Sequence, residues 1–238
     1  MKFWPARGIT IDTCYRDEVA LDHFNMSDTT TKRITMSVKH TNEEYFAALK
    51  AAAAKGDIDA SWVLASAYAD GFVMRENGAW FSVRKNRARA ERLYRIVAKT
   101  RMRDVILGLA GVQKDLGEAL RLERKAWRMG IVEAANNIAM TYSMMGRPKM
   151  CFSWLNRGYA IDPASCAYHL ALCFLVGYGT ARSPEKASQL FNRVIRNEWE
   201  CPDGVECAAK FLDMIERGEF PKAPRSGRSI GSVRPKLH

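Results

Sequence analysis

Three residues in the C-terminal half have types and spacing that could bind a metal ion. Cys166, His169 and Cys173 stand at positions i, i+3 and i+7, so they would share one face of an α-helix. Zinc prefers sulfur and nitrogen ligands, and Cys201 and Cys207 could complete the shell from a nearby loop. However, no CxxC spacing supports a metal site. The favoured interpretation is therefore structural, with buried thiols that pack inside the fold, and no metal or other cofactor is predicted.

The sequence lacks the phosphate-binding and zinc-protease motifs of common enzymes. A nucleotide site needs a Gly-rich loop such as GxxxxGKS or GxGxxG between a strand and a helix, and neither pattern occurs. No HExxH motif occurs either. We therefore predict a non-catalytic protein with no catalytic residues and no small-molecule substrate.

The positive charge of the sequence is concentrated in two segments. The formal net charge is +11 over 238 residues. Residues 84–103 hold nine Lys and Arg and one acid, whereas residues 220–238 hold five bases and no acid. Localised positive charge indicates an acidic partner, which could be a protein surface, nucleic acid or phospholipid.

The first basic segment supplies the candidate site. Four of its bases stand at i, i+3, i+7 and i+11, which predicts one stripe along a helix. The same helix should bury Leu93, Ile96 and Val97. Two aromatic residues that precede the stripe could anchor an interface or stack on bases, and the stripe could also be a solvated helix face. The predicted partner-binding residues are Trp80, Phe81, Arg84, Lys85, Arg87, Arg89, Arg92, Arg95, Lys99 and Arg103.

A recurring pattern predicts the elements that position these residues. Residues 56–71, 130–146 and 162–177 each begin with Gly or Asp and end with Gly. Between these ends, a small, an aliphatic and an aromatic residue follow at intervals of four. This spacing places them on one face of an α-helix, and the closing Gly suits a helix C-terminus, where φ becomes positive.

A second helix is expected after each first helix. The sequences that predict it are RARAERLYRIVAK, EALRLERKAWRMG, CFSWLNRGYAID and EKASQLFNRVIRN. A degenerate repeat with a weak first helix should lie in RDVILGLAGVQKDLGEALRLERKAWRMG. Upstream, TNEEYFAALKAAAAKG predicts another second helix, opened by a capping box from Thr41 to Glu44. GVECAAKFLDMIERG predicts a closing helix.

This pattern resembles the Sel-one-like (Sel1-like) repeat family, which is related to tetratricopeptide repeats. The family's helix pairs run small residue, Leu, Tyr, Gly on the first helix and Ala, Tyr, Ala, Ala, Gly on the second, and the match covers roughly residues 42–218. The resemblance implies an all-α, right-handed α/α solenoid of about four to five helix-turn-helix repeats. It also implies a non-catalytic scaffold, an adaptor or a bacterial immunity protein. Plain tetratricopeptide repeats are the alternative.

Three regions are expected along the chain. Residues 1–41 form an N-terminal extended arm or β-hairpin, because GITIDTCY and RITMSVKH alternate apolar and polar residues. Residues 42–219 form the repeat domain, with a longer loop, FVMRENGAWFSVRKN, inside the first repeat. Residues 220–238 form a basic, flexible C-terminal tail, because they are rich in Pro, Gly and Ser.

Location and function follow from these features as hypotheses. No apolar run reaches the ~18 residues of a membrane span, and the N-terminus lacks the apolar core of a secretory signal. We therefore predict a cytoplasmic protein with reduced cysteines and no membrane partner. The predicted function is protein–protein interaction, most concretely as a cytosolic inhibitor or immunity-type protein that binds one acidic protein. The alternative is a nucleic-acid-associated or ribonucleoprotein component whose stripe and tail contact phosphates.

Overall fold

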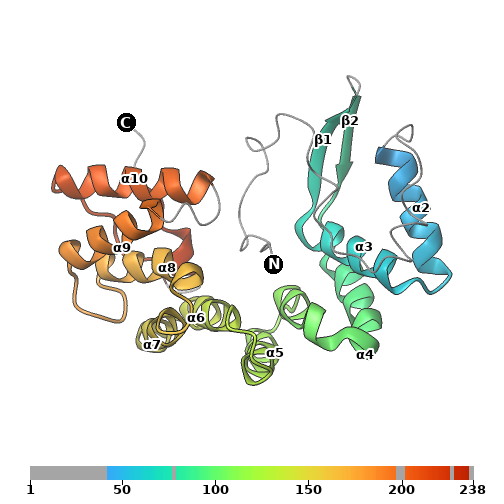
Figure 1. Cartoon of the computed structure of the whole chain (residues 1–238), viewed down its shortest axis with the longest axis horizontal. Helices are drawn as coiled ribbons and strands as arrows, with labels where there is room; N and C mark the ends of the chain where they lie inside the picture. Colours follow the sequence, from blue (N-terminus) through green and yellow to red (C-terminus); the bar gives the residue numbers. More distant parts are fainter. Residues whose placement is uncertain (1–41, 77–78, 197–201, 226–227, 236–238) are drawn as a thin grey trace. The chain divides into compact units, whose positions relative to one another are not determined.

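The structure, a computed structural model, describes residues 42–76, 79–196, 202–225 and 228–235 (Figure 1). Almost all regular structure in these residues is helical, as predicted. Within these ranges, every helix is too short or too polar to cross a lipid bilayer. The predicted N-terminal arm and Thr41 of the predicted capping box lie outside the described residues. The elements are α2 (Asn42–Ala54), α3 (Ile58–Asp70), β1 (Phe72–Glu76), β2 (Ala79–Val83), α4 (Arg87–Gly111), α5 (Leu116–Arg128), α6 (Ala134–Met144), α7 (Pro148–Tyr159), α8 (Pro163–Val176), α9 (Pro184–Arg196), α10 (Pro202–Glu216) and the 3-10 helix η1 (Ile230–Ser232).

The chain forms two compact units, Met1–Lys114 and Asp115–His238. In the first unit, α3 packs against α2 and against α4. The Asp57 side chain begins α3 by accepting a hydrogen bond from the backbone N–H of Ala60 at 2.9 Å. The predicted small, aliphatic and aromatic positions of α3 are all buried, at Ala60, Leu64 and Tyr68. The repeat pattern is thus confirmed as the packing face of this helix.

A β-hairpin stands where the sequence predicts a longer loop. β1 pairs antiparallel with β2, from Phe72 opposite Val83 to Glu76 opposite Ala79. The two residues between the strands read Asn-Gly, and this dipeptide favours the tight turns that join antiparallel strands. Gly71 leads from α3 into the hairpin with a φ of 66°. A Cβ at Gly71 would lie 3.0 Å from the Val83 carbonyl oxygen, so the close approach of the two chain segments requires glycine.

α4 joins two predicted helices across a kink. The backbone is non-helical at Arg101, with φ −126° and ψ 50°. The Arg101 guanidinium forms an ion pair with the buried carboxylate of Asp59 in α3. The segment after the kink buries Val105, Ile106 and Leu109. It is the predicted weak first helix of the degenerate repeat, and it continues the preceding helix without an intervening loop.

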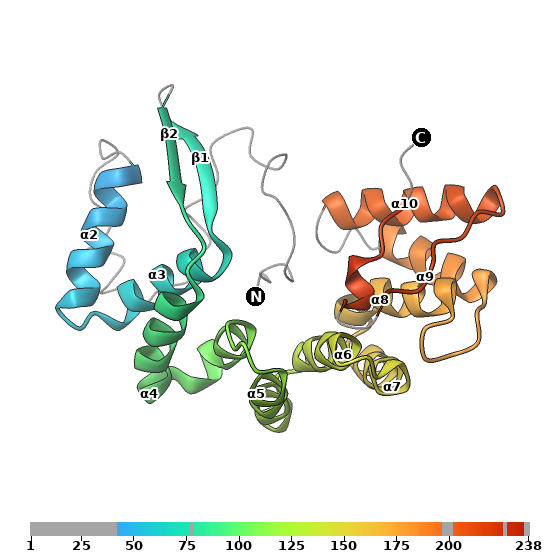
Figure 2. The same cartoon turned by 180° about the vertical axis from the view of Figure 1, so that it is seen from behind.

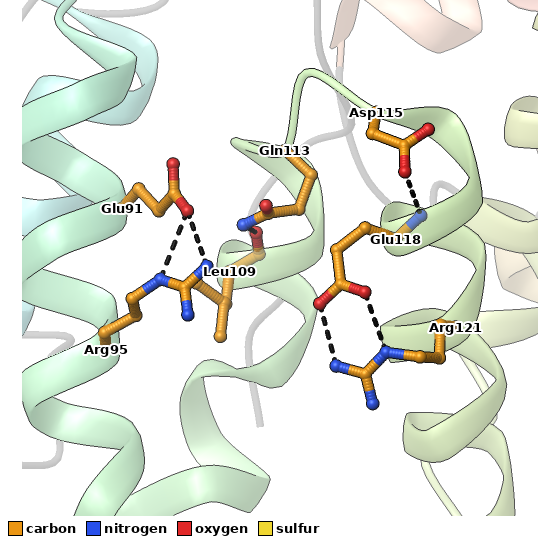
Figure 3. Close-up of polar contacts among 7 residues, drawn as sticks. All are labelled: Glu91, Arg95, Leu109, Gln113, Asp115, Glu118 and Arg121. Carbon is orange, nitrogen blue, oxygen red and sulfur yellow. Dashed lines mark hydrogen bonds and ion pairs between the residues drawn. The ribbon is translucent and has the colours of Figure 1, made fainter.

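The second unit is a run of helices in which each packs against the next, from α5 to α10 (Figure 1). The Asp115 side chain begins α5 by accepting a hydrogen bond from the backbone N–H of Glu118 (Figure 3). It also accepts one from the backbone N–H of Gly117. Small residues let neighbouring helices approach closely. A Cβ at Gly158 of α7 would lie 2.6 Å from Cys166 Sγ of α8 and 2.8 Å from Ala135 Cβ of α6.

Part of the C-terminal tail is docked on the second unit. The sequence predicts a flexible tail over residues 220–238, whereas η1 lies against α8 and α6 (Figure 2). The side chains of Ile230 and Val233 are buried within the apolar core of this unit. Two aliphatic residues in a segment otherwise rich in Gly, Ser and Pro account for the difference, because their burial favours one bound conformation.

Candidate functional site

β2 and the first half of α4 position the predicted partner-binding residues. Trp80 and Phe81 lie in β2, which leads through residues 84–86 into α4. The Asn86 side chain caps α4 by accepting a hydrogen bond from the backbone N–H of Arg89 at 3.0 Å. The first turn of α4 contains no acidic residue. Cations near a helix N-terminus oppose the helix dipole, so the bases here do not serve to stabilise the helix.

All eight predicted bases are exposed, and most of them have no acidic partner among the residues that the structure describes. Arg95 pairs with Glu91, with Nη2 2.8 Å from Oε1 (Figure 3). The Arg89 guanidinium lies 5.5 Å from the centre of the Tyr68 ring and donates to the Tyr68 hydroxyl at 3.3 Å. Within the described part of the chain, the predicted bases that form no ion pair are Arg84, Lys85, Arg87, Arg89, Arg92 and Lys99.

Arg103 does not belong to the same stripe as the other three bases. Arg92, Arg95 and Lys99 lie on the regular part of α4. The non-helical backbone at Arg101 then breaks the helical register before Arg103. The predicted spacing of i+11 assumed an unbroken helix, so the four-residue stripe is corrected to three residues.

Ile96 lies among these bases and not in the core. The sequence places it with Leu93 and Val97 on the apolar side of α4, yet its side chain is 37% exposed while Val97 is fully buried. Ile96 follows Arg92 by four residues and precedes Lys99 by three, so the three side chains are neighbours on the helix surface. The helical spacing of Ile96 from Arg92 and Lys99 was the feature of the sequence that could have indicated its place among the bases. We call Arg84, Lys85, Arg87, Arg89, Arg92, Arg95, Ile96 and Lys99 the α4 surface.

The residues considered as metal ligands are used in packing. Burial raises the pKa of the Cys166 thiol to about 11. A hydrogen bond with Cys151 of α7, together with burial, raises the pKa of Cys173 well above its ordinary value. His169 Nδ1 lies 2.9 Å from Asn136 Oδ1 of α6. Cys201 lies outside the described ranges, and within them no group of three or more His, Cys, Asp or Glu is placed to hold a metal.

Two solved structures share the fold of this chain. No protein-family model matches the sequence, and no curated protein matches it. A Sel1 repeat protein from Oxalobacter formigenes superimposes with a TM-score of 0.51 and 21% identity, over 73% of this chain and 67% of that chain. The protein c5321, a protective antigen present in uropathogenic Escherichia coli strains and displaying an SLR fold, superimposes with a TM-score of 0.54 and 17% identity. That alignment covers 80% of this chain and 40% of c5321.

The chain folds as a Sel1-like repeat solenoid. In this solenoid the recurring residues of the repeats are buried where helices pack, as Ala60, Leu64 and Tyr68 illustrate. Structural similarity at 17–21% sequence identity establishes the fold of this chain and does not establish its function. The residues that can meet a partner are therefore those that the repeat pattern does not explain, and the α4 surface is a charged set of this kind.

One sequence pattern associated with catalysis occurs in the tail of the Sel1-like solenoid. Residues 227–231 read GRSIG, which matches the GxSxG pattern of α/β-hydrolases. In those enzymes the serine stands on a tight turn between a β-strand and an α-helix. Ser229 instead precedes the three-residue helix η1, and the strands of the described residues are β1 and β2, far away in the sequence. The context of a nucleophile is therefore missing at Ser229.

Proposed function

We propose that this protein is a non-catalytic interaction protein that binds an acidic partner protein through the α4 surface. The observation that carries this proposal is the exposure of Ile96 between the exposed bases Arg92 and Lys99 of α4. An apolar centre with a polar rim is the usual arrangement of a protein interface. Complementary charge at the rim steers the partner and selects it.

A more specific form of the proposal is a cytosolic inhibitor or immunity-type protein. Such a protein masks the active surface of its target and needs no catalytic group of its own. Solenoids present extended surfaces of the kind that this task requires. The α4 surface would then cover an acidic region of the target that contains an apolar pocket for Ile96.

Nucleic acid is the competing partner, because the same bases would attract phosphates. The position of Ile96 favours a protein. A phosphate backbone offers no apolar surface to bury an aliphatic side chain that lies between the bases, whereas a protein surface can bury it. The test must therefore separate the two classes of partner directly.

The experiment is an affinity purification with the full-length protein from native lysate, with and without nuclease. The test variant is Arg92→Glu/Arg95→Glu/Lys99→Glu. The matched control is Lys149→Glu/Arg196→Glu/Lys222→Glu, which makes the same change of charge at exposed positions outside the α4 surface. Circular dichroism checks that both variants fold.

We expect one protein to co-purify in stoichiometric amount, to survive nuclease, to be lost in the test variant and to be kept in the control. Material that disappears with nuclease and absorbs strongly at 260 nm would assign the surface to nucleic acid. Loss of the partner in both variants would show attraction by net charge alone, and the proposed site would be rejected.

A further inference from the structure

The docked tail segment presents two aliphatic side chains to the second unit from one side of a tight turn. The turn is closed by backbone hydrogen bonds from Ser232 to Ser229 at 2.9 Å and from Val233 to Ile230 at 3.1 Å. Side chains three residues apart in a 3-10 turn point the same way. Ile230 is 0% exposed and Val233 is 6% exposed, so both are inserted into the unit.

The buried hydroxyl of Ser143 in α6 hydrogen-bonds to the backbone of this turn. The Ile230 N–H donates to Ser143 Oγ of α6 at 2.7 Å. The Ser143 hydroxyl donates to the Tyr178 hydroxyl at 3.1 Å, which in turn donates to the Ser143 carbonyl at 3.2 Å. Each hydroxyl in this chain both accepts and donates. The Ser143 oxygen is thus oriented to accept a hydrogen bond from a peptide N–H, and a buried acceptor without a donor is costly.

The close contact of the turn with His169 of α8 also requires glycine at position 231. A Cβ at Gly231 would lie 3.0 Å from His169 Nε2 and 3.4 Å from His169 Cδ2. The imidazole cannot easily move aside, because its Nδ1 hydrogen-bonds to Asn136 Oδ1. A larger residue at this position would push the turn away from α8.

Three polar side chains of this segment remain exposed to solvent. Arg228, Ser232 and Arg234 are exposed, and Arg234 donates to the carbonyl oxygens of Gly231 and Val233 in its own turn. Recognition therefore depends on Ile230, Gly231 and Val233 together with one backbone N–H. These four features define a short peptide ligand of the pattern Ile-Gly-x-Val.

We propose that α6 and α8 form a peptide-binding site that the chain's own residues 229–234 occupy in cis, and that the site also accepts an Ile-Gly-x-Val segment of a partner protein. This site is independent of the α4 surface, which belongs to the other unit. Residues 217–225 contain no helix or strand and connect the segment to α10. Such a tether holds a ligand at an effective concentration of about a millimolar. A partner segment must therefore compete with the resident tail.

The test uses the full-length protein and a fluorescein-labelled peptide with the sequence of residues 225–236. The variant Ile230→Asp/Val233→Asp releases the tail. Its matched control, Lys222→Gln/Ala223→Asp, makes the same change of net charge at exposed positions of the tail outside residues 229–234. A second release variant, Gly231→Val, adds no charge and serves if the first does not fold. A peptide with Asp in place of its Ile and Val tests the specificity of the probe.

Fluorescence anisotropy should show about 10-fold or greater tighter binding of the peptide to either release variant than to the wild type or the control, because the resident tail no longer competes. The Asp-substituted peptide should not bind. Equal affinity of the release variants and the wild type would overturn the proposal. Dimers of the wild type that the release variants abolish would identify the occupant in trans as a second copy and would overturn its assignment to a partner protein.

Discussion

Two basic segments of this chain each contain an isoleucine, and the two residues differ in their exposure to solvent. Ile96 in α4 is 37% exposed, whereas Ile230 in the tail is 0% exposed. The first segment forms a long helix whose core side is already filled by Val97 and its neighbours. The described part of the second segment contains only the 3-10 helix η1, which lies against α6 and α8. The comparison shows that positive charge in a sequence does not indicate whether its apolar residues face a partner or the core.

The largest expected effect is a difference between the two isoleucines in how much each contributes to the stability of the fold. Ile230→Asp should lower the free energy of unfolding by about 2–4 kcal/mol, because a buried aliphatic contact is lost and a carboxylate cannot be buried unpaired. Ile96→Asp should change it by no more than about 0.5 kcal/mol. Urea denaturation followed by circular dichroism measures both. Equal effects of the two substitutions would remove the distinction between the two segments.

The second prediction concerns pH and affects the tail site. Burial, with a further contribution from the charge of Arg234, lowers the pKa of His169 to about 4. The unfolded chain keeps an ordinary histidine pKa of about 6.5. Between these values the unfolded state binds a proton that the folded state does not, so stability falls as the pH drops from 6.5 towards 4. The full loss below pH 4 is roughly 3 kcal/mol.

The variant His169→Gln isolates this effect, because glutamine does not titrate. The wild type minus variant difference in unfolding free energy should change sharply between pH 7 and pH 4.5 and stay level above pH 7. Urea denaturation at each pH provides the difference, which cancels the titration of all other groups. A difference that is independent of pH would contradict the lowered pKa of His169.

The third prediction contrasts the forces at the two sites through their response to salt. A complex formed by the α4 surface should weaken by about 10-fold or more between 0.05 and 0.5 M NaCl, because exposed charges are screened. Binding of the Ile-Gly-x-Val peptide to the tail-released variant should change by less than about 3-fold, because aliphatic burial dominates it. Titrations at the two salt concentrations measure both. Similar salt dependence at the two sites would contradict the contrast.

The smallest expected effect tests the one described ion pair within the α4 surface. Glu91→Gln removes the i, i+4 partner of Arg95 (Figure 3). The loss of stability should be about 0.3–0.5 kcal/mol, while affinity for an acidic partner should rise about 2-fold, because one opposing charge is gone. Thermal unfolding and a binding titration report the two changes. Glu118→Gln is the matched control, because it removes an i, i+3 pair with Arg121 outside the α4 surface.

The repeat architecture could be predicted from the sequence because it is encoded locally. Small, aliphatic and aromatic residues at intervals of four define one face of each helix, and this face is buried at Ala60, Leu64 and Tyr68 as expected. The Asn-Gly dipeptide between the two strands was also a local signal, and it favours a hairpin over the longer loop predicted there. Local patterns specify which face of an element is apolar, and this information was sufficient for the fold class.

Only the tertiary structure decided the details that matter for function. The kink that separates Arg103 from Lys99 occurs at Arg101, whose ion-pair partner, Asp59, is 42 residues away in the sequence. The docking of Ile230 depends on Ser143, which is 87 residues away. The exposure of Ile96 depends on how far neighbouring helices cover α4. The physical reason is the same in each case: a sequence pattern shows that a side chain can be buried or paired, but distant residues determine whether it is.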